Sequence, residues 1–144
     1  MARHEERGTT LIELLVVLVL IALVSGLVGP AIGARIDNIS LQSTATDLAS
    51  QLRKAQALAR AEQVPIVAVY ANQEFRFLKQ SKEVGSFKLP TAITLVSDAG
   101  AFVFLPTGQI LAPHAIELEN ARGRRVRIDV SSLKGIAVQT VVAS

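Results

Sequence analysis

Residues 7–24 read RGTTLIELLVVLVLIALV, an almost wholly apolar run that holds one acid, Glu13, near its start. The apolar segment extends from Leu11 to Val28, and only Glu13, one serine and one glycine interrupt it. As a helix it would be roughly 27 Å long, close to the ~30 Å thickness of a bilayer's hydrocarbon core. The segment therefore predicts a helix that crosses a membrane once.

The basic residues that flank this segment predict its orientation. Arg3 and Arg7 precede it, whereas Arg35 is the nearest base after it, so we expect a cytoplasmic N-terminus. A secretory signal peptide cleaved near residues 29–31, a plain anchor with the acid among the headgroups, and a specialised leader are the three interpretations. A carboxylate in lipid costs a few kcal/mol and needs a partner, so Glu13 favours the specialised leader.

The run Gly8-Thr-Thr-Leu-Ile-Glu13 resembles the type IV prepilin motif, in which Gly-Phe-Thr-Leu-Ile-Glu is usual. The resemblance implies that a prepilin peptidase cuts after Gly8 and methylates the new N-terminus at Thr9. It also implies that Glu13 pairs with the N-terminal amine of a neighbouring subunit, which sets the register of a filament, and that Pro30 bends the helix. Thr9 departs from the motif, because the family usually has phenylalanine there.

Beyond Pro30 the helical pattern resumes. Apolar residues recur at spacings of three and four, which is one face of a helix. We call this face the apolar stripe; it consists of Leu41, Ala45, Leu48, Leu52, Ala55 and Ala59. The sequence therefore predicts an amphipathic helix over residues 31–62, packed against the rest of the chain and ended by Val64-Pro65.

After Pro65 the period changes to two, which is typical of strands. Seven short strands are expected, at residues 65–70, 74–79, 91–96, 101–105, 115–119, 124–130 and 135–142. Turn signals between them predict an antiparallel sheet, with a type I turn at Leu105-Pro-Thr-Gly108. Glu117 and Glu119 are expected on a solvated face.

A long N-terminal helix followed by an antiparallel β-domain is the pilin-like architecture, an α+β fold. Within it, Phe102-Val-Phe-Leu-Pro-Thr-Gly108 and Gly135-Ile-Ala-Val138 resemble the H-type minor pseudopilins of type II secretion. The expected organisation is a leader at 1–8, a transmembrane helix at 9–30, a periplasmic helix at 31–62 and a β-domain at 63–144.

The resemblance implies a structural subunit near the tip of a periplasmic pseudopilus, anchored by one helix in the bacterial inner membrane. Its implied partners are the other minor pseudopilins, the major pseudopilin, the prepilin peptidase, the inner-membrane assembly platform and secreted cargo. Such a subunit helps to export folded proteins across the outer membrane and performs no catalysis itself.

The sequence offers no catalytic set and no cofactor or metal site. It lacks cysteine, and its two histidines, His4 and His114, lie far apart with no partner ligand nearby. Asp98 lies in an expected turn and is a single carboxylate, which is no cation site. The net charge of +3 is mild and does not demand a nucleic-acid partner.

One basic cluster has three interpretations. It consists of Arg122, Arg124, Arg125 and Arg127. The cluster is a solubilising edge, a contact for acidic subunits, or a phosphate-binding patch of a DNA-binding minor pilin from a type IV pilus or competence system. No aromatic side chain interleaves with these arginines to stack on bases, which disfavours the DNA-binding alternative.

Overall fold

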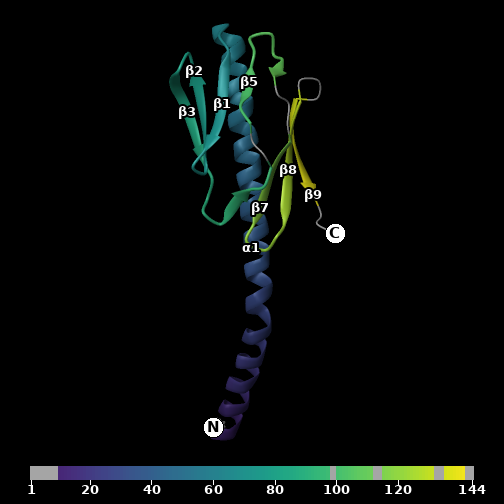
Figure 1. The fold of residues 1–144 in the computed structure, drawn as a ribbon. Helices are drawn as coiled ribbons and strands as arrows, with labels where there is room; N and C mark the ends of the chain where they lie inside the picture. Colours follow the sequence, from purple (N-terminus) through teal and green to yellow (C-terminus); the bar gives the residue numbers. More distant parts are fainter. Residues whose placement is uncertain (1–9, 98–99, 112–114, 132–134, 142–144) are drawn as a thin grey trace, which may run out of the picture. The chain divides into compact units, whose positions relative to one another are not determined.

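A computed structural model describes residues 10–97, 100–111, 115–131 and 135–141, with the side chains of 26–35 and 140–141 excepted. Its first element is a helix of 52 residues, α1 (Leu11–Glu62) (Figure 1). By its internal contacts the chain divides into two units, Met1–Ile36 and Asp37–Ser144. The helix therefore contributes its first half to one unit and its second half to the other.

In the first unit the described residues from Leu11 onwards are helical. The large apolar side chains between Leu11 and Val24 each expose 48–86% of their surface. The helical backbone continues through Pro30, and the bend expected there stays a prediction. No helical stretch in the described part of the chain is long and apolar enough to cross a membrane. The membrane span expected from the sequence stays a prediction too.

The second unit is built on the apolar stripe of α1. Every residue of the stripe is at most 5% exposed, and Ala49 between them is fully buried. The expectation that this face packs against the rest of the chain is confirmed, because these residues belong to one core cluster with the strands. The helix ends at Glu62, three residues before Pro65, as the sequence predicts.

Nine strands follow the helix in the described part of the chain. They are β1 (Ile66–Ala71), β2 (Glu74–Lys79), β3 (Lys82–Lys88), β4 (Ile93–Leu95), β5 (Phe102–Phe104), β6 (Ile110–Leu111), β7 (Ala115–Asn120), β8 (Arg125–Ser131) and β9 (Gly135–Val141). All pairings between them are antiparallel. The expected order of a helix followed by antiparallel strands is confirmed.

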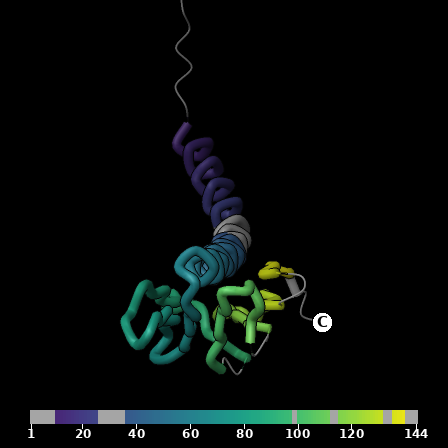
Figure 2. The backbone as a smooth tube through the Cα atoms, turned by 90° about the horizontal axis from the view of Figure 1, so that it is seen from above, coloured from purple at the N-terminus to yellow at the C-terminus, as the bar shows by residue number. Residues whose placement is uncertain are grey.

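The strands form two sheets, a division that the sequence-based expectation of antiparallel sheet did not specify. The five-stranded sheet has the order β3-β2-β1-β5-β6, and the four-stranded sheet has the order β4-β7-β8-β9. Seen along the helix, the two sheets lie side by side, and the second half of α1 packs across both (Figure 2). Both sheets turn alternate residues towards the helix, so the core is a single layer between helix and sheets.

Two strands were absent from the sequence-based prediction. In β3 every residue except Phe87 is exposed, so the apolar alternation that marks a half-buried strand is missing. The other, β6, has only two residues. Both lie at the edges of the five-stranded sheet, where a strand buries little and its sequence is weakly constrained.

The turn expected at Leu105–Gly108 is present and docks on the helix. The Gly108 N–H donates to the Leu105 carbonyl at 2.9 Å, which closes the turn. Gln56 on α1 donates its Nε2 to the Gly108 carbonyl at 3.0 Å. Gly108 has a φ of +87°, a conformation that residues with a Cβ rarely adopt. The turn is therefore a contact between β5, β6 and the helix as well as a chain reversal.

Substitution of Gly108 by alanine is expected to cost more stability than the same change at Gly123. Both glycines have positive φ, +87° and +77°, so an alanine at either is strained by about 1–2 kcal/mol. A Cβ at Gly108 would also overlap the Arg60 guanidinium, whereas at Gly123 it meets nothing within 4 Å. Urea unfolding of the full chain in detergent measures both losses; equal losses would show that Arg60 does not pack on the turn.

Candidate functional site

The first turn of α1 gives Glu13 a local role that the sequence reasoning missed. The Thr10 carbonyl accepts hydrogen bonds from the N–H groups of Glu13 (3.0 Å) and Leu14 (3.2 Å). Thr10 therefore occupies the N-cap position, and Glu13 is the third residue of the helix. This Thr-x-x-Glu order is that of a capping box, and an acid in the first turn also interacts favourably with the helix dipole. The signal was present in the sequence as T10-L-I-E13.

Several residues named from the sequence lie outside the described part of the chain. The proposed cleavage position is among them, since the description begins after Thr9. They are Gly8, Thr9, His4, His114 and Asp98. The assignments made to these residues stay predictions.

Two arginines of the cluster, Arg125 and Arg127, form ion pairs with carboxylates of β7 and β8. Arg125 Nε lies 2.6 Å from Glu119 Oε2 across the β7–β8 pair. Arg127 lies between two acids, with Nε 2.9 Å from Asp129 Oδ1 and Nη1 3.6 Å from Glu117 Oε1. Glu117 and Glu119 lie on the face of β7 opposite the buried Ile116 and Leu118, as expected, but these carboxylates expose only about a third or less of their side chains.

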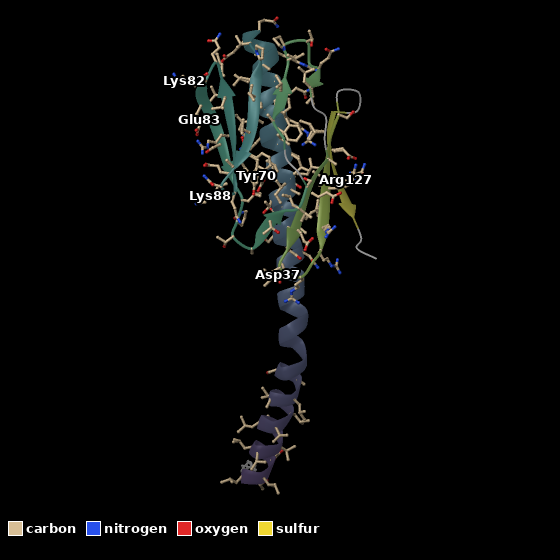
Figure 3. The ribbon with its side chains drawn as sticks, viewed as in Figure 1. Asp37, Tyr70, Lys82, Glu83, Lys88 and Arg127 are labelled. Atoms are coloured by element: carbon tan, nitrogen blue, oxygen red, sulfur yellow. The ribbon has the colours of Figure 1, made fainter. Side chains whose placement is uncertain are left out.

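Arg122 reaches back to the helix. Its Nε lies 2.6 Å from Oδ2 of Asp37, which is 85 residues earlier in the chain (Asp37 is labelled in Figure 3). Among the described carboxylates none pairs with Arg124, so three of the four arginines are engaged. The partner acids are Asp37, Glu117, Glu119 and Asp129. Their negative charges offset those of Arg122, Arg125 and Arg127, so little net positive charge remains at this surface. The arginine side chains of these pairs are nearly half exposed, so solvent screens the pairs and they contribute little to stability.

Asn120 positions the two arginines of the β7–β8 turn, which sequence reasoning also missed. Its Oδ1 accepts the backbone N–H groups of Arg122 and Arg124, both at 3.0 Å. Its backbone carbonyl accepts the Gly123 N–H at 2.9 Å, and Gly123 has a positive φ. An asparagine three residues before a glycine is the signal that could have located this turn.

Two observations on the described residues bear on metal binding and proton transfer. They contain no group of three or more histidine, aspartate or glutamate residues placed to hold a metal. Burial raises the pKa of Tyr70, and the hydrogen bond to Asp129 raises the pKa of Arg127. Both shifts lead away from neutral pH, so neither group is prepared for proton transfer.

Comparison with known proteins supports the resemblance of the N-terminal segment to a prepilin motif. Residues 3–29 match the family described as "Prokaryotic N-terminal methylation motif". This motif is typical of type IV pilin-like proteins. No curated protein and no solved structure matches the chain significantly. The motif and the order of helix then antiparallel strands are consistent with a pilin-like fold.

Proposed function

We propose that this chain is a minor pseudopilin of a type II secretion system, a structural subunit near the tip of the periplasmic pseudopilus. Its task is to help export folded proteins across the outer membrane, and it performs no chemistry itself. The observation that carries the proposal is the methylation motif at residues 3–29, followed by a helix whose second half packs on antiparallel strands. The turn Leu105–Gly108, part of the stretch whose sequence resembles H-type pseudopilins, is closed by a hydrogen bond from the Gly108 N–H to the Leu105 carbonyl.

The N-terminal helix is proposed to anchor the subunit in the bacterial inner membrane. A helix that is apolar on all sides is stable when lipid or protein surrounds it, and the side chains from Leu11 to Val24 are exposed in the isolated chain. The N-terminus lies in the cytoplasm and the β-domain in the periplasm. Prepilin peptidase removes residues 1–8 and leaves Thr9 as the first residue.

Glu13 is proposed to hold the subunit in register with its neighbours in the filament. Cleavage at Gly8 creates a free amine at Thr9, and the Glu13 carboxylate of one subunit pairs with the Thr9 amine of the next. An acid in an apolar environment is tolerable when a cation compensates it and costly when unpaired. The other minor pseudopilins and the major pseudopilin are the neighbours, and the assembly platform supplies the driving motion.

The DNA-binding alternative makes a different prediction about the arginine cluster. A phosphate-binding patch needs free cationic side chains, but carboxylates engage Arg122, Arg125 and Arg127. We therefore expect the full chain in detergent to bind duplex DNA weakly, with no loss of binding when all four arginines of the cluster become glutamine. Salt-sensitive binding that this fourfold change abolishes would favour the minor-pilin alternative.

The proposal is tested by the phenotype of a deletion strain. We expect folded exoproteins to accumulate in the periplasm while piliation and DNA uptake stay normal. The full-length gene supplied in trans is the control and restores secretion. Normal secretion together with failed piliation or transformation would overturn the proposal and support the pilus alternative.

A further inference from the structure

Asn120 is a buried amide whose oxygen and nitrogen are in very different situations. The residue lies at the end of β7 and is only 6% exposed. Its Oδ1 accepts the N–H groups of Arg122 and Arg124, whereas its Nδ2 has no acceptor among the described residues. A buried N–H group without a partner is destabilising, so in folded proteins such groups are nearly always satisfied by protein or by ordered water. Nδ2 therefore indicates a site for an acceptor.

The two backbone hydrogen bonds fix the orientation of this amide. An asparagine side chain can be turned over with little change in shape, and its hydrogen bonds decide between the two orientations. Only the oxygen can accept from the N–H groups of Arg122 and Arg124, both at 3.0 Å. A reversed amide would place its own N–H groups against these two donors. Nδ2 is therefore held on the side of the amide away from them.

A small pocket lies beside Asn120, where α1, the start of β4 and the end of β7 meet. Its volume is about 30 Å³, and it is lined by Asp37, Ser40, Ala92, Ile93, Asn120 and Ala121. A bound water needs about 10–15 Å³ of such space and about two to four polar partners. Asp37 and Ser40 are three residues apart on α1, so both can present oxygen atoms to one pocket. The pocket thus has the size and the polar groups that a water requires.

We propose that this pocket binds one ordered water molecule, which joins the β7–β8 turn to the helix. The water accepts a hydrogen bond from Asn120 Nδ2 and donates one to the Asp37 carboxylate, with Ser40 Oγ as its third partner. Asp37 Oδ2 also accepts from Arg122 Nε, but a carboxylate has about four lone-pair sites, so this one bond does not exhaust it.

The charges around the pocket favour water over an ion. An anion that accepted from Asn120 Nδ2 would be repelled by the Asp37 carboxylate on the opposite side of the pocket. A cation would meet the protons of the Nδ2 group, which cannot act as a ligand. Water both accepts and donates, so it satisfies the two sides at once.

The bound water gives the β7–β8 turn a second link to α1. The first link is the ion pair between Arg122 and Asp37, whose side chains are both nearly half exposed, so solvent weakens it. The second link runs through the buried side chain of Asn120, which also holds the backbone of Arg122 and Arg124. The water thereby fixes the position of the turn that carries these two arginines.

The test is NMR of the isotope-labelled full-length chain in detergent micelles, with cross-relaxation measured between side-chain amides and water. We expect the Asn120 amide to give a signal with the sign of a long-lived bound water. Asn72 is the matched control, because it is an exposed asparagine in the β1–β2 turn, and it should give the sign of brief hydration. The sign of brief hydration at Asn120 as well would overturn the proposal.

Three variants identify the partners of the water. Asp37→Ala removes the acceptor on the helix, so the Asn120 signal should change to that of Asn72. Arg122→Gln is the matched control, because it also breaks the Asp37 ion pair but keeps the carboxylate, and the signal should persist. Ser40→Ala removes a hydroxyl proton that could relay a false signal, and the water should stay bound through Asn120 and Asp37. Persistence of the signal in Asp37→Ala, or its loss in either of the other two variants, would contradict the proposed site.

Discussion

Replacement of Leu48 by alanine is expected to lower the free energy of unfolding by about 2–5 kcal/mol. Leu48 is fully buried in the apolar stripe, at the level where α1 packs across both sheets. The change removes methyl groups and leaves a cavity that helix and strands cannot close without moving together. For a domain of this size such a loss is a large share of the total stability.

The matched control lies on the same helix. Ile39 is 69% exposed, so Ile39→Ala removes similar carbon without creating a cavity. We expect its effect to stay within about 0.5 kcal/mol. Urea unfolding of both full-length variants in detergent, followed by circular dichroism, measures the difference. Comparable losses for the two variants would show that the stripe does not hold the helix to the sheets.

Replacement of Glu13 by valine is expected to leave membrane insertion intact and to abolish recruitment into the filament. Valine removes an acid from an apolar segment, so insertion becomes easier. It also removes the proposed partner of the Thr9 amine. Carbonate extraction of membranes measures insertion, and co-purification with the major pseudopilin measures recruitment. Normal recruitment of the valine variant would contradict the proposed role of Glu13.

A glutamine at the same position separates the two roles of Glu13. Glutamine can take the place of glutamate as the third residue of a capping box. It cannot form an ion pair with the amine of a neighbour. We therefore expect Glu13→Gln to fail in recruitment as Glu13→Val does. Normal recruitment of the Glu13→Gln variant would mean that Glu13 is needed for helix capping and not for the register between subunits.

Local patterns in the sequence predicted much of the fold. The apolar stripe identified the buried face of α1 because helical spacing leaves one face to bury. β8 alternates strictly and β2 does so over Glu74–Phe77, and the bounds of both strands were predicted to within a residue. Proline and glycine located the Leu105–Gly108 turn, since each restricts the backbone in a known way.

The remaining features depend on distant parts of the chain. The division into two sheets follows from which strands pair, and alternation alone does not encode pairing. Arg122 appeared to be part of a free basic cluster because its partner, Asp37, belongs to the helix. The edge strand β3 was missed because a strand that buries one face only weakly has no periodic signal.

The central claim is that this chain is a pilin-like subunit processed at its leader, and the mature N-terminus tests it most directly. Intact mass and N-terminal sequencing of the protein purified from membranes are expected to show that the chain begins at Thr9, with loss of residues 1–8. Gly8→Leu is the matched control and should remain uncut. A mature chain that begins near residue 32 would contradict the account, because the segment would then be an ordinary signal peptide and Glu13 would be discarded with it.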